Sequence, residues 1–231
     1  MDHPITYELP LSNFPNMANH PNLEVIEDYI WVIHNFVTDE ECDYYVTVGE
    51  NATEEEWHAH NTEWWVGKFL PMPQDEKTMS VINGLAERLK DLIGHGDYAV
   101  GAPMSVHRQL PGQFMFDHAD NPNEKDHKNN HVLTSFVVYF SNFNGGNIYY
   151  EHLGLEYHPR KGDLVIHPGT ERYRHGTRPV EPGPIRYNGT LWTYDPDVVA
   201  LHAEGRVFDE TDEINPVDKA LMSKPKRPKL I

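Results

Sequence analysis

The spacing of apolar residues changes along the chain, from a helical period in the first half to short β-type runs in the second. Residues 76–93 carry apolar side chains at steps of three and four, which predicts an amphipathic helix packed on a sheet: Met79, Ile82, Leu85, Leu89 and Leu92. Residues 29–36 are rich in β-branched and aromatic side chains and predict a strand. A helix through Cys42 should follow, with Thr38 and Asp39 as N-cap candidates.

From Ala102 onward, short β-rich runs alternate with turn residues such as Pro111-Gly112 and Lys161-Gly162. The predicted strands cover residues 104–110, 113–118, 132–140, 147–151, 163–167, 172–180 and 185–194. About seven or eight strands at this spacing indicate a sandwich or barrel. We expect a mainly β (α+β) fold, a double-stranded β-helix (jelly roll) buttressed by N-terminal helices.

The absence of a linker of distinct composition favours one domain over residues 1–231. Within it we expect a jelly-roll core at about 102–195, strand and helix support over 24–101 and a C-terminal tail at 198–231. The end of that tail is basic and Pro-rich, so we do not expect it to pack against the core.

Charge and cysteine content narrow the function classes. The formal charge of −17, from 36 acidic and 19 basic residues, would repel phosphate backbones, so nucleic acid is not an expected partner. With Cys42 alone, the chain forms no internal disulfide, which suits a reducing cytoplasm. No apolar run approaches the length of a membrane span, and the first residues lack the features of a signal peptide, so we expect a cytoplasmic protein without membrane contact.

A His-x-Asp triplet and a distant His provide the main chemical signal. His118 and Asp120 are two positions apart, so on a strand they face the same side, and His175 lies in a later β-rich run. Two imidazoles and one carboxylate form a set that suits non-haem Fe(II) and leaves coordination positions open. Alternative distal ligands are His152, His158 and above all His167, and His58-Ala59-His60 is a competing motif in a polar segment.

Arg186 follows His175 at the start of a half-buried β-rich run. A buried guanidinium needs an anionic partner, and its fork binds a carboxylate through two hydrogen bonds. We therefore predict that Arg186 holds a carboxylate ligand near the metal.

These residues resemble the 2-oxoglutarate- and Fe(II)-dependent dioxygenases of the prolyl 4-hydroxylase type, over about Tyr29 to Asp195. The similar segments include residues 31–42, Pro111 to Phe114, His118 to Asn123, Gly145-Gly146, and Arg186 with Trp192. The resemblance implies that His118, Asp120 and His175 bind iron, that Arg186 binds the distal carboxylate of 2-oxoglutarate, and that Tyr139 hydrogen-bonds the same carboxylate. Gln109 stands where many relatives have a Tyr.

The resemblance further implies Fe(II) as cofactor, 2-oxoglutarate and O2 as co-substrates, succinate and CO2 as co-products, and ascorbate as a candidate reductant. The preferred substrate is a peptidyl proline, gripped by a lid over residues 57–72. Two alternatives remain: a hydroxylase of a free amino acid or another small metabolite, and a non-catalytic jelly-roll binding protein.

Overall fold

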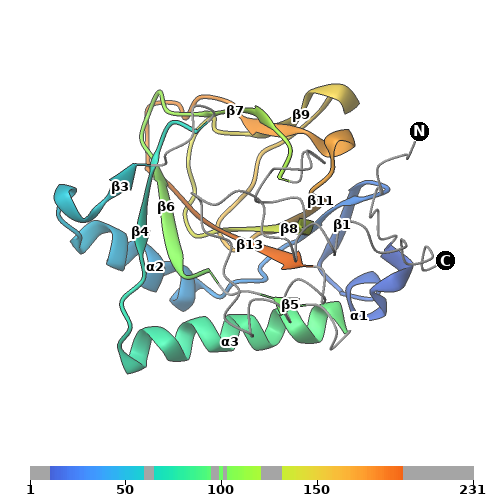
Figure 1. The fold of residues 1–231 in the computed structure, drawn as a ribbon, viewed down its shortest axis with the longest axis horizontal. Coiled ribbons are helices and arrows are strands. Elements are labelled where there is room, and N and C mark those ends of the chain that lie inside the picture. The colour runs from blue at the N-terminus through green and yellow to red at the C-terminus, as the bar shows by residue number, and fades with distance from the viewer. Residues whose placement is uncertain (1–10, 60–64, 95–98, 101–102, 121–131, 195–231) are drawn as a thin grey trace, which may run out of the picture.

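The structure is a computed structural model that describes residues 11–59, 65–94, 99–100, 103–120 and 132–194 (Figure 1). The predicted C-terminal tail at 198–231 lies outside the described residues. No helix among the described residues has the length and apolar character needed to cross a membrane.

The described residues form two β-sheets and a set of helices (Figure 1). The strands are β1 Leu23–Glu27, β2 Ile30–Ile33, β3 His58–Ala59, β4 Lys68–Pro71, β5 Ala99–Val100, β6 Ser105–Gln109, β7 Met115–His118, β8 Val132–Tyr139, β9 Ile148–Tyr150, β10 Leu155–Tyr157, β11 Leu164–Pro168, β12 His175–Thr177 and β13 Arg186–Tyr194. The α-helices are α1 Pro15–Ala18, α2 Asp39–Asn51 and α3 Glu76–Ile93, and the 3-10 helices are η1 Leu11–Asn13, η2 Glu54–Glu56, η3 Glu151–Leu153 and η4 Glu171–Tyr173.

Within the described residues, the larger sheet has the order β1-β2-β11-β8-β13-β6-β4-β3, with β5 beside the end of β13. The smaller sheet has the order β10-β9-β12-β7. All pairings among the described strands are antiparallel, and apart from the consecutive pairs β1-β2, β3-β4 and β9-β10, neighbouring strands come from distant parts of the sequence. This is the topology of a double-stranded β-helix, or jelly roll, and it confirms the predicted fold class.

Helices α2 and α3 cover the outer face of the larger sheet, and the smaller sheet lies on its other side (Figure 1). The helix predicted at residues 76–93 is α3, with the same bounds. Its N-cap is Asp75, whose side chain accepts a hydrogen bond from Thr78 N, and it ends at Gly94 in the left-handed conformation. Thr38 and Glu41 form a capping box at the start of α2, which also confirms the helix expected there.

Strand β8 separates two apolar cores. Phe136, Val138 and Phe140 face the helices, where Phe140 stacks on Tyr45 of α2 with ring centroids 4.1 Å apart. Val137 and Tyr139 face the smaller sheet, where they join the inner cluster. Because both faces of β8 are buried, its sequence is almost continuously apolar rather than alternating.

Several sequence predictions differ from the structure. The strand expected at 172–180 is split into η4 and the short β12, and β1, β3, β4, β5 and β10 were not predicted. The structure corrects the expectation of a lid over residues 57–72. Residues 68–71 pair with β6 as strand β4, and the side chains of Trp57 and Trp65 are buried. The guanidinium carbon of Arg108 lies 4.2 Å from the ring centroid of Trp57, so the described residues of this segment belong to the scaffold; residues 60–64 lie outside the described part of the chain.

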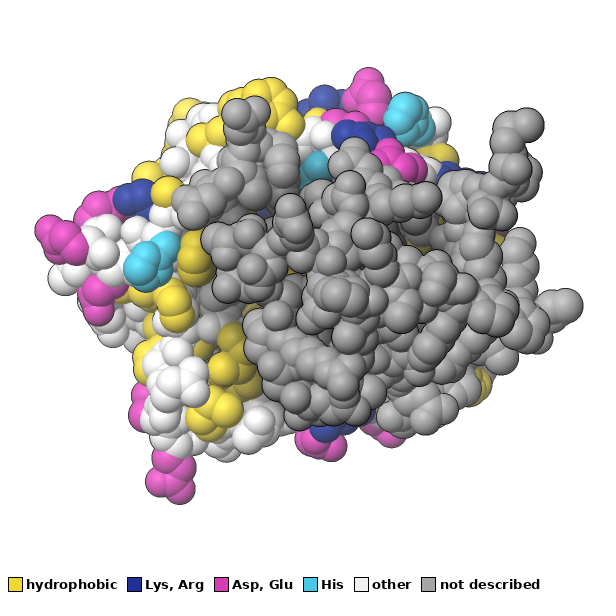
Figure 2. All heavy atoms as spheres, viewed as in Figure 1, with side chains coloured by type: hydrophobic (Ala, Val, Ile, Leu, Met, Phe, Trp, Pro, Cys, Tyr) yellow, Lys and Arg dark blue, Asp and Glu magenta, His cyan; other side chains and the backbone are white. Residues whose placement is uncertain are grey.

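Figure 2 shows one face of the molecule, on which the acidic side chains of the described residues lie dispersed around the rim, with Lys and Arg between some of them. The strong negative charge of the chain therefore forms no single acidic cluster among the side chains visible on this face.

Candidate active site

The site lies between the two sheets, where β7 and β12 pair. His175 is opposite His118 and Thr177 is opposite Met115, so β7 has one more residue than β12 between these pairs. This β-bulge turns both Met115 and His118 toward the inside, although they are an odd number of positions apart. Phe116, within the bulge, is 52% exposed. The bulge is what aims His118 into the barrel.

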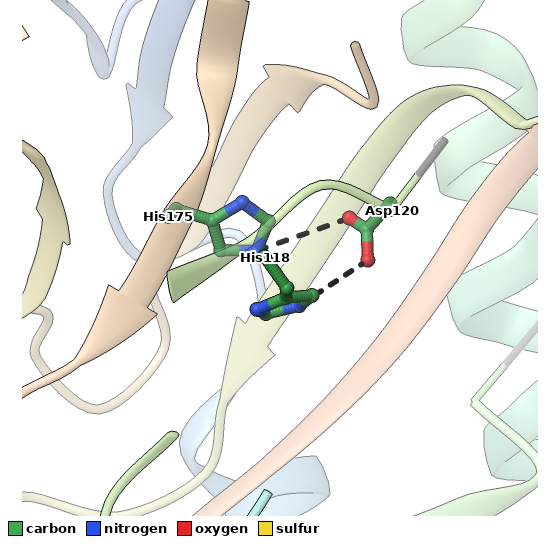
Figure 3. Close-up of side chains that lie close together, drawn as sticks. All are labelled: His118, Asp120 and His175. Atoms are coloured by element: carbon green, nitrogen blue, oxygen red, sulfur yellow. Dashed lines mark ion pairs between the residues drawn. The ribbon is translucent and has the colours of Figure 1, made fainter. Parts of the chain in front are cut away.

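His118, Asp120 and His175 converge in the interior, as Figure 3 shows. Their candidate ligand atoms lie within 4.8 Å of one another. Asp120 carboxylate oxygens are 3.7 Å from His118 Nε2 and 3.9 Å from His175 Nε2. All three side chains are buried, so two imidazoles and one carboxylate share a small, nearly dry space.

Backbone carbonyls fix the orientation of both imidazoles. His118 Nδ1 lies 3.0 Å from Phe116 O, and His175 Nδ1 lies 3.1 Å from Tyr173 O. Since a carbonyl only accepts, each Nδ1 donates to it, which leaves Nε2, the nitrogen nearer Asp120, as the atom available to a metal ion. This is the arrangement that metal-binding histidines commonly show.

Asp120 follows the end of β7 and is held from the larger sheet. The Ser135 hydroxyl of β8 donates a hydrogen bond to Asp120 Oδ2. Sequence reasoning missed this contact, because Ser135 lies inside an apolar strand and 15 residues from Asp120 in the chain. Ser135 thereby links the carboxylate to β8, whose described residues are all buried.

An ion pair joins the two histidine strands from the other side. Arg174 Nε donates to Asp117 Oδ2 at 2.6 Å, and Arg174 also donates to the Asp117 carbonyl at 2.9 Å and to Glu171 at 3.0 Å. Asp117 and Arg174 directly precede His118 and His175. Their contact therefore restrains the separation of the two imidazoles.

Burial and mutual charge shape the protonation of the cluster. Burial lowers the pKa of His175 well below its ordinary value, and the neighbouring His167 and His118 lower it further. For Asp120, burial alone would raise the pKa, but the hydrogen bond with His118 and the charges of His175 and His118 outweigh it and leave a strongly lowered pKa. The site is thus prepared to present a carboxylate and at least one neutral imidazole to a cation.

Arg186 opens β13 beside this cluster and is 3% exposed. Its Nη1 donates to the side-chain oxygens of Gln109 and, at 2.9 Å, Asn188, and its Nη2 donates to the Tyr139 hydroxyl at 3.4 Å. Its Nε is buried without a hydrogen-bond partner among the described residues. Every contact is to a neutral group, so the positive charge has no carboxylate partner in the described part of the chain.

The cost of this arrangement points to an anionic ligand. Burial lowers the pKa of Arg186, although Tyr139 opposes the shift. A buried cation without an anion is unfavourable by several kcal/mol. Gly146, with φ +59°, lies so close that a Cβ there would be 3.2 Å from Arg186 Cδ, so the turn before β9 helps to position the guanidinium. Neutral hydrogen-bond partners therefore orient the Arg186 guanidinium, but no described carboxylate balances its positive charge.

The other histidine candidates are outside the cluster. His152 and His158 are exposed, and His58 is exposed on β3, while His60 lies outside the described residues. His167 is fully buried and its ring centroid lies 4.2 Å from that of His175. Only His118, Asp120 and His175 bring ligand atoms together in the described residues, so His167 packs against the site instead.

A buried His-Asp-His cluster beside an unneutralised arginine, inside a double-stranded β-helix, defines a protein of the non-haem iron oxygenase class. A family model described as the 2OG-Fe(II) oxygenase superfamily matches residues 104–194, from β6 to the end of β13. The chain therefore carries a 2OG-Fe(II) oxygenase domain, and the class of enzyme that this domain defines is the 2-oxoglutarate-dependent dioxygenase. No curated protein matches the sequence.

Solved structures of similar fold include three prolyl hydroxylases. A viral collagen prolyl hydroxylase of Paramecium Bursaria Chlorella virus-1 has 19% identity and a TM-score of 0.56, covering 71% of this chain and 95% of that chain. A Trichoplax adhaerens prolyl hydroxylase, in complex with a hypoxia inducible factor peptide fragment, has 18% identity and a TM-score of 0.58, covering 83% and 92%. A Pseudomonas putida prolyl-4-hydroxylase has 15% identity and a TM-score of 0.54, covering 79% and 97%. At these identities the likeness establishes the fold.

Proposed function

We propose that this protein is an Fe(II)- and 2-oxoglutarate-dependent dioxygenase that hydroxylates a peptidyl proline. His118, Asp120 and His175 bind the iron, and Arg186 with Tyr139 binds the distal carboxylate of 2-oxoglutarate. Bound Fe(II) would let O2 and 2-oxoglutarate react to succinate and CO2 while one oxygen atom enters a C–H bond of the substrate.

One observation carries the proposal: three buried ligand groups converge next to a buried guanidinium whose charge no described carboxylate balances. A structural metal site would close its coordination shell with a fourth protein ligand, and the described residues supply three. The donor set of two imidazoles and one carboxylate suits Fe(II) with open positions. A dicarboxylate would satisfy both the open positions and Arg186.

The choice of a peptidyl substrate is supported by the fold and by the names of the proteins that share it. A collagen prolyl hydroxylase and a prolyl hydroxylase bound to a peptide fragment have the same architecture. The bulge of β7 also places Phe116, an exposed aromatic side chain, two residues from His118. An extended peptide could pack its apolar side chains there.

The test is succinate release from 2-oxoglutarate with Fe(II) and ascorbate, with and without proline-containing peptides, followed by mass spectrometry of the peptides. We expect slow uncoupled succinate release alone and faster release with a peptide that gains one oxygen atom. His175→Ala should abolish release while circular dichroism stays unchanged. Stimulation by free proline or another metabolite, but by no peptide, would favour the small-molecule alternative.

Arg186 has its own test with a matched control. Arg186→Lys keeps the charge but loses the planar fork, so it should raise the 2-oxoglutarate concentration for half-maximal release. Arg178→Lys, on a partly exposed arginine paired with Glu156, should leave that concentration unchanged. Absence of succinate release from the wild-type protein under all conditions would overturn the proposed activity and favour a binding protein.

A further inference from the structure

Tyr150 faces the interior next to the candidate iron site. In the pairing of β9 with β12, Ile148 is opposite the inward-facing Thr177, so Tyr150, two residues on, also points inward. Its ring centroid lies 5.9 Å from that of His175 and 5.5 Å from that of His167. The side chain is 1% exposed.

The hydroxyl of Tyr150 is buried without a hydrogen-bond partner among the described residues. Two other tyrosines show the usual arrangement: Tyr45 donates to Pro103 O at 3.1 Å, and Tyr157 donates to Asp163 at 2.8 Å. Leaving a buried hydroxyl unpaired is unfavourable, and a phenylalanine at the same position would avoid that cost. The described residues alone give no reason for an oxygen at this position.

Tyr150 has neighbours from both parts of the site, His175 of the ligand cluster and Tyr139, which contacts Arg186. Tyr150 belongs to the same inner cluster as Tyr139, whose hydroxyl accepts a hydrogen bond from Arg186. A tyrosine hydroxyl is protonated at neutral pH and can donate a hydrogen bond, and the Tyr150 ring that carries it lies beside His175 of the ligand cluster.

We propose that Tyr150 is a co-substrate contact, whose hydroxyl donates a hydrogen bond to the carboxylate next to the keto group of 2-oxoglutarate. The inference rests on the proposed function, in which Arg186 holds the other carboxylate. Tyr150 then donates a hydrogen bond to the carboxylate of 2-oxoglutarate that lies nearer the metal. Binding of this carboxylate removes the energetic cost of the unpaired hydroxyl. A hydrogen bond to a charged acceptor is stronger than one between neutral groups.

The test compares Tyr150→Phe with a matched control, Tyr45→Phe, in the full-length protein. Thermal unfolding of the metal-free protein measures the structural role of each hydroxyl. Calorimetric titration with 2-oxoglutarate in the presence of Mn²⁺, a redox-inert substitute for Fe(II), measures the contact, and titration with Mn²⁺ alone measures metal affinity. Neither readout depends on turnover.

For Tyr150→Phe we expect a metal-free melting temperature equal to or above that of the wild type, unchanged Mn²⁺ affinity and about ten-fold or greater weakening of 2-oxoglutarate binding. Tyr45→Phe should lower the melting temperature, because it loses the bond to Pro103, and leave 2-oxoglutarate affinity unchanged.

Two results would overturn the inference. Equal 2-oxoglutarate affinity of the wild type and Tyr150→Phe with a lowered melting temperature would show that the hydroxyl is held by ordered water. Equal affinity with an unchanged melting temperature would show that it has no role. If the wild type itself bound no 2-oxoglutarate with Mn²⁺, the proposed function would fail as well, and this outcome is distinct from the first two.

Discussion

The hydrogen bond from Ser135 to Asp120 allows a sharp test of how the fold prepares the candidate metal site. Ser135 is fully buried on β8 and Asp120 is 8% exposed, so water cannot replace the bond when Ser135→Ala removes it. Loss of such a partner to a metal-binding carboxylate typically costs 10- to 100-fold in metal affinity, or about 1.4 to 2.7 kcal/mol. A hydrogen bond to a buried charged group has the same scale, about 1.5–3 kcal/mol.

The assay is titration of the metal-free protein with Fe(II) under anaerobic conditions, or with Co²⁺ and detection of its visible absorption. Ser141→Ala is the matched control, because the Ser141 hydroxyl donates to Ile185 O at 2.8 Å and accepts from Tyr187 N at 2.9 Å, away from the triad. It should lower the melting temperature without changing metal affinity. A dissociation constant for Ser135→Ala within about two-fold of the wild-type value would refute the reasoning.

Three further predictions concern the fold. His34 contacts Asp163 at 2.9 Å and Glu24 at 2.8 Å. Burial lowers the pKa of His34, but the hydrogen bonds to these two carboxylates outweigh burial, so the folded-state pKa is raised. The contribution of His34 to stability is therefore complete below pH 6.5 and is lost as the pH rises through the folded-state pKa. The difference in unfolding free energy between wild type and His34→Gln should therefore shrink from pH 6 to pH 8, and a constant difference would contradict this. Gly176→Ala should destabilise by about 1–3 kcal/mol in urea unfolding, because a Cβ would lie 2.6 Å from Met115 O, and unchanged stability would show that β7 can move away. Leu89→Ala, at a fully buried position of α3, should cost about 2–5 kcal/mol in the same assay, and a loss below 1 kcal/mol would mean that the core under the helix collapses into the gap.

The sequence alone determined the elements whose signal is local. The amphipathic period of residues 76–93 fixed both ends of α3, since the apolar stripe, Asp75 and Gly94 are all encoded within one segment. Arg186 could be predicted to need an anion because a charged residue heads a half-buried strand. The pairing of His118 with Asp120 also followed from their spacing, with β7 ending at His118 and Asp120 in the next turn.

Only the tertiary structure decided which distant groups complete the site. His167 and His175 were both plausible from sequence, and the choice depends on strand order: β12 pairs with β7, whereas β11 pairs with β2 and β8. Ser135, Gln109 and Tyr150 have no local signal, because an inward-facing polar group on a strand is distinguished only by what lies opposite. The bulge in β7 likewise appears only when its register with β12 is known. Strand periodicity encodes which face a residue takes, but the long-range pairing that brings two faces together is a property of the whole chain.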